Sequence, residues 1–183
     1  MGAVELHPWG SMIDNIEHPD MLVLDLDPDP NLEWEFVVET ALKLRDMFGD
    51  EGLSTWPKLT GGKGIHVMVP IEPTLTWEQG RAFIRSIAER LATTMPNRYT
   101  LSSSLALRPG RIYLDYARNG LGATTVGCYS PRARLGFPVA MPVMWDDLER
   151  GLRSNSFTLA QPGIPAVREP IRRRSKRRPL EMA

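Results

Sequence analysis

The chain has 183 residues, of which 42% are hydrophobic and 24% charged, and its formal net charge at pH 7 is zero. This composition is typical of one soluble domain with a buried core, and it excludes a membrane-spanning protein because no apolar run approaches the length of a span. The first ten residues show no signal-peptide pattern, the single cysteine excludes an internal disulfide, and the three histidines lack the spacing of a zinc site.

The N-terminal half predicts two strand-and-helix units after an irregular start. The apolar run MLVLDLD predicts a strand over residues 21–27, which the following prolines end. Apolar residues at helical spacing predict a helix over residues 32–48, with a glycine after its last turn. The segment LSTWPKLTGGKGIHVMVPIEP, residues 53–73, predicts two strands joined by a glycine turn. A second helix is predicted to begin at Thr76, which forms a capping box with Gln79.

The C-terminal half predicts further strands and one short helix. RIYLDYA predicts a strand over residues 111–117, and TTVGCYSPRARLG predicts a strand leading into a basic loop over residues 124–136. MWDDLERGL predicts a short helix over residues 144–152. The order of elements is mixed and contains a hairpin. We therefore expect an α+β fold, with a mixed or antiparallel sheet and flanking helices.

The chain is predicted to form one domain over residues 1–162, followed by a basic tail over residues 163–183. The tail has seven basic and two acidic residues, a net charge of +5, and includes the run RRRSKRRP. Such a polar, highly charged segment is predicted to be disordered. It fits either a nonspecific arm for nucleic-acid phosphates or a solvated run of charge at the terminus.

Three carboxylates are predicted on the non-core sides of strands. Asp25 and Asp27 share one face of the first strand because side chains two apart point the same way. Two neighbouring anions cannot enter a dry interior without a compensating charge. Asp115 takes the same side of the strand over residues 111–117. Together the three would suit one or two Mg²⁺ or Mn²⁺ ions, while the first pair alone also fits a strand that runs out into solvent.

The glycine turn is a second cluster, and its residues are suited to binding an anionic ligand. Gly61, Gly62 and Gly64 allow the backbone to approach a bulky anion, Lys63 adds positive charge, and His66 points away from the apolar face of its strand. A phosphate-bearing ligand would find N–H groups, an ammonium and an imidazole together. The turn is not a P-loop, because other residues occupy the positions that a P-loop needs. The alternative is a plain hairpin turn with a solvated lysine.

A third cluster is cationic. Arg132 and Arg134 are two residues apart, so an extended backbone would point both guanidinium groups the same way, and such groups suit phosphate oxygens. Such a pair is also common on an ordinary solvated face. Arg118 follows Asp115 at the same rim. Taken together, the three clusters supply what is needed to bind a metal–nucleoside triphosphate and transfer its nucleotidyl group.

Four segments carry a resemblance to a known family: ELHPWGS, VLDLDPDP, TGGKGIHVMVP and IYLDYARNGLGATTVGCYSPRARLGFPVAMPVMWDDL. With these in order, the chain resembles the polymerase domain of bacterial ligase D, in the archaeo-eukaryotic primase superfamily. The resemblance implies an RRM-like primase-polymerase core that adds NTP or dNTP to a DNA primer 3′ end in non-homologous end joining. It implies that Asp25, Asp27 and Asp115 are the metal-binding and catalytic triad. It implies that the nucleotide is held by His7, Thr60, Lys63, His66, Arg118, Arg132 and Arg134.

The same resemblance implies cofactors and partners. These are a two-metal site for Mn²⁺ or Mg²⁺, DNA as primer–template or break ends, a Ku-like end-binding protein and a DNA ligase, with no membrane. The expected location is the cytoplasm, at the nucleoid. The family usually has a large segment before ELHPW, and this chain begins almost at that motif. We therefore expect weakened recognition of DNA ends, and exposed apolar surface that favours self-association.

Two other functions fit part of the sequence, and a purely structural role would leave the gathered charges unexplained. The first is a catalytically inactive remnant that binds nucleotide or DNA without turnover. The second is a phosphatase of the haloacid dehalogenase type, because a strand followed by DxD resembles its nucleophile motif. That motif requires Thr or Val where Asp29 stands, and it does not explain the other segments.

Overall fold

A computed structural model of the chain describes residues 4–160. The predicted tail over residues 163–183 lies outside these residues. The elements in chain order are β1 (Met21–Pro28), α1 (Trp34–Asp50), β2 (Trp56–Leu59), β3 (Ile65–Pro70), α2 (Trp77–Thr94), β4 (Tyr99–Thr100), the 3-10 helix η1 (Leu105–Leu107), β5 (Ile112–Asp115), β6 (Met141–Pro142) and α3 (Trp145–Glu149). Within the described part of the chain, no helix is long and apolar enough to span a membrane.

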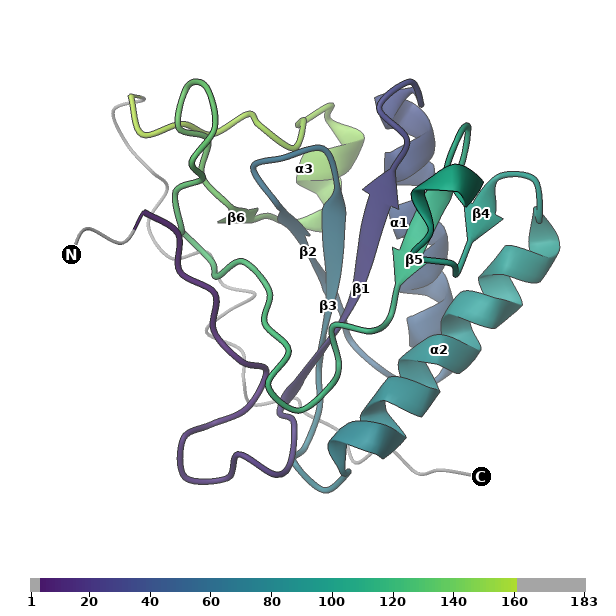
Figure 1. Cartoon of the computed structure of the whole chain (residues 1–183), viewed down its shortest axis with the longest axis vertical. Helices are drawn as coiled ribbons and strands as arrows, with labels where there is room; N and C mark the ends of the chain where they lie inside the picture. Colours follow the sequence, from purple (N-terminus) through teal and green to yellow (C-terminus); the bar gives the residue numbers. More distant parts are fainter. Residues whose placement is uncertain (1–3, 161–183) are drawn as a thin grey trace.

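The strands form one six-stranded mixed sheet in the order β4-β5-β1-β3-β2-β6 (Figure 1). The pairs β1–β3, β1–β5, β2–β3 and β2–β6 are antiparallel, and the short pair β4–β5 is parallel. The predicted α+β class is therefore confirmed. Strand β1 lies in the middle of the sheet, between β5 and β3. Side chains of these two strands therefore flank those of β1 on the polar face.

One face of the sheet forms the main core with helices α1 and α2. Leu22, Leu24 and Leu26 of β1 are fully buried there, as the alternation of β1 predicts. They belong to one cluster with Leu44 of α1 and Ile84 of α2. Burying such side chains is the dominant favourable term in folding. Both long helices are thus kept on the face that Asp25 and Asp27 do not share.

The opposite face is covered only in part, by chain without regular structure. At one end of this face Val23, Met68 and Trp56 form a small apolar cluster across three strands. Figure 1 shows the N-terminal segment and the chain after β5 lying over the same side of the sheet. The remainder of the face carries the charged side chains described below.

The predicted helix boundaries are close, with one informative error. Helix α1 was predicted to end at Gly49 but continues to Asp50. The helix is ended by Gly52, which has a left-handed conformation with a φ of 74°. The predicted capping box of α2 is present: the Thr76 hydroxyl accepts from the Gln79 N–H at 3.2 Å, and the Thr76 N–H donates to Gln79 Oε1 at 2.9 Å.

The predicted strand within residues 124–136 is wrong. This segment, all of it described, contains only an isolated bridge between Pro131 and Val139. The φ of Tyr129 is 64°, a left-handed conformation that breaks an extended run. The backbone here pairs with the N-terminal segment instead, as when the Gly127 N–H donates to Leu6 O at 2.8 Å. Strands β4 and β6 and the 3-10 helix were not predicted.

Candidate active site

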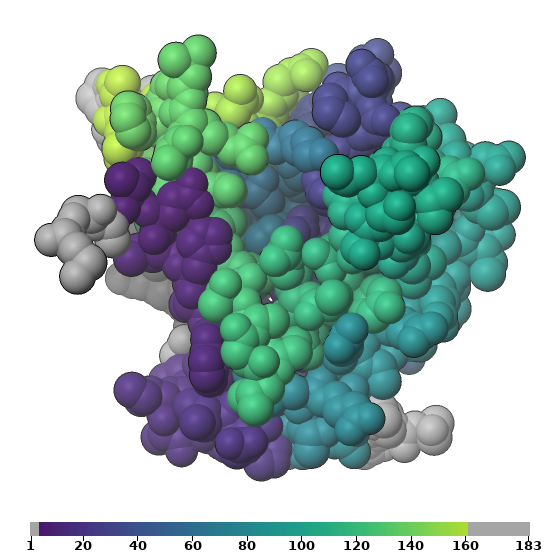
Figure 2. Space-filling view, viewed as in Figure 1, coloured from purple at the N-terminus to yellow at the C-terminus, as the bar shows by residue number. Residues whose placement is uncertain are grey.

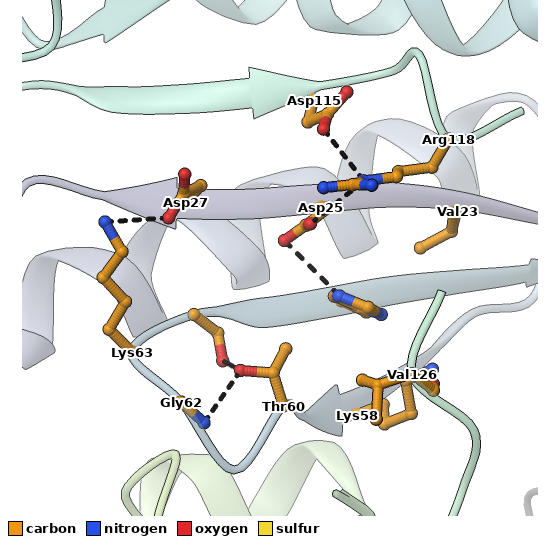
Figure 3. A network of polar contacts seen from close by, with 12 residues as sticks. Val23, Asp25, Asp27, Lys58, Thr60, Gly62, Lys63, Asp115, Arg118 and Val126 are labelled. Atoms are coloured by element: carbon orange, nitrogen blue, oxygen red, sulfur yellow. Dashed lines mark hydrogen bonds and ion pairs between the residues drawn. The ribbon is translucent and has the colours of Figure 1, made fainter. Parts of the chain in front are cut away.

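Four charged or titratable side chains form a row across the polar face of the sheet. The strand registers place Asp115 of β5 opposite Asp25 of β1, Asp25 opposite His66 of β3, and His66 opposite Lys58 of β2. Directly opposed residues share a face and have Cβ atoms about 4.5–5.5 Å apart. The close-up in Figure 3 shows Asp115, Asp25 and Lys58 in this order across the sheet, with Arg118 between the two acids. The row therefore joins two acids to two bases over four strands.

Asp25 is at the centre of the row. Its Oδ1 lies 3.5 Å from His66 Nε2, and its Oδ2 lies 3.8 Å from Arg118 Nε. Burial raises the pKa of Asp25, but His66, and then the charges of Arg118 and Lys58, lower it by more. The net pKa of Asp25 lies below its ordinary value, so the carboxylate is ionised at neutral pH.

Arg118 lies beside both acids of the row. Its Nε is 3.0 Å from Asp115 Oδ2, and Asp115 Oδ1 accepts from the Ala117 N–H at 2.9 Å. The two opposed carboxylates thus have a cation next to them in this structure, as their mutual repulsion requires. Arg118 was predicted to contact the nucleotide; here its partners are the acids Asp25 and Asp115.

Asp27 lies on the same face of β1 but has different partners. Its Oδ1 is 2.9 Å from Lys63 Nζ, and its Oδ2 pairs with Arg108. Lys63 Nζ also donates to Pro28 O at 2.8 Å, which fixes its position beside β1. Arg108 also stacks over the Tyr113 ring, with Cζ 4.3 Å from the ring centroid. Arg108 was missed by sequence reasoning, because LALRPGR has no periodicity that indicates the direction of its side chain.

Two of the three carboxylates that were predicted to converge lie directly opposite each other on adjacent strands. Asp25 and Asp115 are opposed, whereas residues 4–160 hold no group of three or more His, Cys, Asp or Glu side chains arranged to bind a metal ion. The donor chemistry still fits Mg²⁺ or Mn²⁺, because carboxylate oxygens are their preferred ligands. The assignment of the triad as metal ligands remains a prediction.

His66 and Lys58 are both buried on the polar face. Burial lowers the pKa of His66 below its ordinary value, against the nearby charge of Asp25, and its Nδ1 has no hydrogen-bond partner among the described residues. Lys58 donates to Val126 O at 2.5 Å, and burial lowers its pKa to about 8. Lys58 was not among the predicted site residues. The alternation in WPKL places it opposite His66 only once the register of the hairpin is known.

The glycine turn is held rigidly by hydroxyl groups. The Thr60 hydroxyl donates to Gly64 O at 3.1 Å and accepts from the Gly62 N–H at 3.2 Å. Gly61 has a φ of 68°, which favours glycine. A Cβ at Gly64 would lie 2.1 Å from Leu26 O, so this position requires glycine for the turn to approach β1. The turn therefore presents Lys63 to the central strand at a fixed place.

The predicted arginine pair lies at the site, but its backbone conformation differs from the predicted one. The Arg134 N–H donates to Arg132 O at 2.8 Å, which is a tight turn rather than the predicted extended run. Arg132 Nη1 donates to Thr60 O at 2.5 Å. A side chain at Gly62 would lie 3.4 Å from Arg134 Cζ, so Arg134 covers the glycine turn. Both guanidinium groups thus lie next to the glycine turn, although the backbone between them is not the extended run that the sequence predicted.

Most of the predicted site residues line one pocket of about 210 Å³ on the open face of the sheet. Figure 2 shows the surface hollowed between the bright green loop and the teal segment that carries η1, with blue atoms of the glycine turn region on its floor. Nine of the ten predicted site residues line this pocket: His7, Asp25, Asp27, Thr60, Lys63, His66, Arg118, Arg132 and Arg134. Asp115 is not among the described residues that line the pocket, but it pairs with Arg118, which is.

Fold and pocket define an α+β domain with acids and cations gathered on the uncovered face of a mixed sheet. The chain belongs to the LigD primase-polymerase domain family, whose sequence profile matches residues 1–168. This membership excludes the haloacid dehalogenase alternative. The solved polymerase domain of Mycobacterium tuberculosis ligase D, in complex with DNA, has a TM-score of 0.71 and 32% sequence identity, and the match covers 74% of this chain and 48% of that chain.

Curated proteins that are similar to this chain in sequence include LigD proteins. The multifunctional non-homologous end joining protein LigD of Pseudomonas aeruginosa is 40% identical over 159 residues, which is 87% of this chain and 19% of that protein. The bifunctional LigD of Bacillus subtilis is 32% identical over 158 residues, 86% of this chain and 26% of that protein. The chain therefore spans only a minor part of the length of each of these relatives.

Proposed function

We propose that this chain is a metal-dependent nucleotidyltransferase of the primase-polymerase type. It adds NTP or dNTP to the 3′ end of a DNA primer during non-homologous end joining. The observation that carries the proposal is the pocket in which carboxylates of β1 face the glycine turn and the arginines of the basic loop. A triphosphate needs cations and N–H donors, and its transfer needs acids beside them.

In this proposal the metal ligands are Asp25, Asp27 and Asp115. One or two divalent ions held there would stabilise the charge on the attacking and leaving oxygens of the transferred phosphoryl group. Asp25 and Asp115 approach from adjacent strands, and Asp27 follows Asp25 on the same face of β1. Oxygen ligands in this arrangement suit Mg²⁺ and Mn²⁺ better than softer metals.

The cations of the pocket bind and orient the triphosphate. Lys63, Arg132 and Arg134 present positive charge to the phosphate oxygens, and Thr60, which lines the same pocket, holds the glycine turn beside them. His7 and His66 add imidazole nitrogens at the pocket wall. The primer 3′-hydroxyl then attacks the α-phosphorus and pyrophosphate leaves. The cations of the pocket are in place before the reaction, so they stabilise the negative charge of the transition state without moving.

A second function, binding of nucleotide or DNA without turnover, is favoured by one observation. Asp27 is paired with Lys63 and Arg108, and the described residues hold no group of three metal-binding side chains. A site in this state keeps its phosphate-binding cations but lacks the full set of acids. The two functions differ in whether bound nucleotide is incorporated.

Primer extension with Mn²⁺ tests the proposal directly. We expect the full chain to extend a primer on gapped DNA, and Asp25→Asn and Asp115→Asn each to lower the rate by about 100-fold or more, because removing preorganised charge at a reacting centre has effects of that size. Asp14→Asn, at an exposed position, is the matched control and should keep the wild-type rate. Nucleotide binding without extension by the wild-type chain would support the second function instead.

Partners follow from the family and belong to the same proposal. The polymerase domain of M. tuberculosis ligase D was solved with DNA, so we propose DNA ends as the partner here too. A Ku-like end-binding protein and a DNA ligase would act in the same repair pathway, at the nucleoid. We further propose that residues 1–162 act as one domain and that the basic tail contacts nucleic-acid phosphates.

A further inference from the structure

The carboxylate of Glu5 connects two residues of the pocket that come from distant parts of the chain. Its Oε2 lies 2.9 Å from His7 Nε2 and 3.2 Å from Arg132 Nε. Its Oε1 accepts from the Ala133 N–H at 2.8 Å. His7 and Arg132 line the pocket, whereas Glu5 is not part of the pocket lining that the structure describes. Glu5 therefore acts on the pocket through these neighbours.

The backbone that carries Glu5 is itself held in place. The Leu6 N–H donates to Ser130 Oγ at 2.8 Å, and Leu6 O accepts from the Gly127 N–H at 2.8 Å. Pro8 O accepts from the Thr125 N–H at 3.4 Å. The N-terminal segment thus lies along the chain that leads to the basic loop, so the position of the Glu5 side chain is determined by backbone contacts.

Arg132 is restrained from two sides. Glu5 Oε2 forms an ion pair with its Nε, which has no hydrogen bond among the described residues, and its Nη1 donates to Thr60 O at 2.5 Å. Its side chain is only 15% exposed. A guanidinium group held in this way leaves its remaining N–H groups free for a ligand, and it loses little rotamer freedom when the ligand binds.

The charge of Glu5 is unfavourable for an anion-binding pocket. The contacts with His7 and the Ala133 N–H, and then Arg132, lower the pKa of Glu5 to about 2, so the carboxylate is ionised at neutral pH. A fixed negative charge beside the pocket repels a triphosphate. Long-range electrostatics and positioning therefore predict opposite effects when this charge is removed.

We propose that Glu5 is a positioning residue, which fixes Arg132 and His7 in the geometry that binds the triphosphate of the incoming nucleotide. This inference rests on the proposed nucleotide-binding function of the pocket. The gain from holding two ligand-binding side chains in place exceeds the repulsion from one carboxylate. Glu5→Gln keeps an acceptor for the Ala133 N–H but presents no charge to Arg132, and Glu5→Ala removes every side-chain interaction of this residue.

The first experiment measures binding of ATP with Mg²⁺, and the KM and kcat for primer extension, with the full chain. We expect Glu5→Ala to raise the Kd and KM for ATP about tenfold and Glu5→Gln about threefold, with kcat changed less than about twofold, because Glu5 orients Arg132 and His7 equally in the ground state and the transition state. Glu89→Gln is the matched control, because Glu89 pairs with Arg85 on the exposed surface of α2 at 2.8 Å. It should leave Kd and KM unchanged.

A second experiment removes the residue through which Glu5 acts. In an Arg132→Ala background, Glu5→Ala should raise the Kd for ATP by less than about threefold, because one of the two side chains that Glu5 fixes is already absent. Tighter ATP binding by Glu5→Gln, or an undiminished effect in the Arg132→Ala background, would overturn the positioning role. If the wild-type chain binds ATP and both Glu5 variants bind it equally well, this inference alone fails. If the wild-type chain binds no ATP, the proposed function fails with it.

Discussion

Lys58 lies in an environment far from the one that lysine prefers. Its side chain is 1% exposed, and lysine is almost never fully buried unless paired. It lies on the polar face of β2, donates to Val126 O and faces His66 across the sheet. The carbonyl that it holds belongs to the wall of the pocket. We infer that burying the Lys58 ammonium group lowers the free energy of unfolding.

The pH dependence of stability measures that cost. Burial lowers the pKa of Lys58 from 10.5 to about 8, so between these values the unfolded chain holds a proton that the native chain has released. The free energy of unfolding therefore rises with pH in this interval. Relative to Lys58→Met, the wild-type chain should gain about 2 kcal/mol between pH 8 and pH 10, since one pKa unit corresponds to about 1.4 kcal/mol. Urea unfolding at each pH measures this difference.

Lys43→Met is the control for this comparison. Lys43 lies on α1, and its contact with Glu39 raises its pKa above the ordinary value, so it does not titrate in this interval. The variant should show the wild-type slope from pH 8 to pH 10. Parallel slopes for the wild-type chain and Lys58→Met would show that the Lys58 ammonium is not destabilised by burial.

At the scale of single elements, the start of α2 depends on its capping box. Thr76 and Gln79 satisfy two N–H groups that a helix otherwise leaves without partners. The same helix buries Ile84, Ile87 and Leu91 against the sheet. A correctly placed first turn is what aligns these side chains with the core, so the cap contributes to the packing of the whole helix.

Thr76→Ala should lower the free energy of unfolding by about 1 kcal/mol, the usual effect of removing an N-cap hydroxyl. Urea denaturation followed by circular dichroism measures it. Thr93→Ala is the control, because the Thr93 hydroxyl donates to Arg90 O within the last turns of the same helix and is exposed. It should change the free energy of unfolding by less than about 0.5 kcal/mol. Equal destabilisation of the two variants would mean that the capping box has no special contribution.

At the scale of the whole molecule, Asn119 connects the chain after β5 to the central strand. The pairing of β1 with β5 reaches only as far as Asp25, so Val23 has no strand partner on that side. The Asn119 side chain replaces one: the Val23 N–H donates to its Oδ1 at 2.8 Å, and its Nδ2 donates to Val23 O at 2.7 Å. The loop that carries Arg118 is thereby fixed over the polar face.

Asn119→Ala leaves the buried N–H and carbonyl of Val23 without these partners. We expect it to lower the free energy of unfolding by about 3 kcal/mol, since each buried unpaired group costs about 1–3 kcal/mol. Thermal and urea unfolding measure the effect, with Asn97→Ala at an exposed turn as the control. A decrease no greater than that of the control would show that water replaces the amide at this position.

Features that depend on neighbours along the chain were predictable from the sequence. The alternation in β1 separated the buried leucines from Asp25 and Asp27, and helical spacing located α1 and α2 to within about two residues. The cap at Thr76 was also predictable, because its two partners are three residues apart. These patterns depend on the geometry of one strand or one helix, which repeats every two or every 3.6 residues.

Features that depend on distant parts of the chain were decided by the tertiary structure. Strand registers placed Asp115 opposite Asp25 and Lys58 opposite His66, and no local pattern contains a register between separate strands. The segment over residues 124–136 reads as a strand, but its backbone pairs with residues near Leu6 and it adopts a coil. The sequence alone therefore determined which residue types face the pocket. Long-range packing and hydrogen bonding determined which of them meet, because contact energies outweigh local propensity wherever the two disagree.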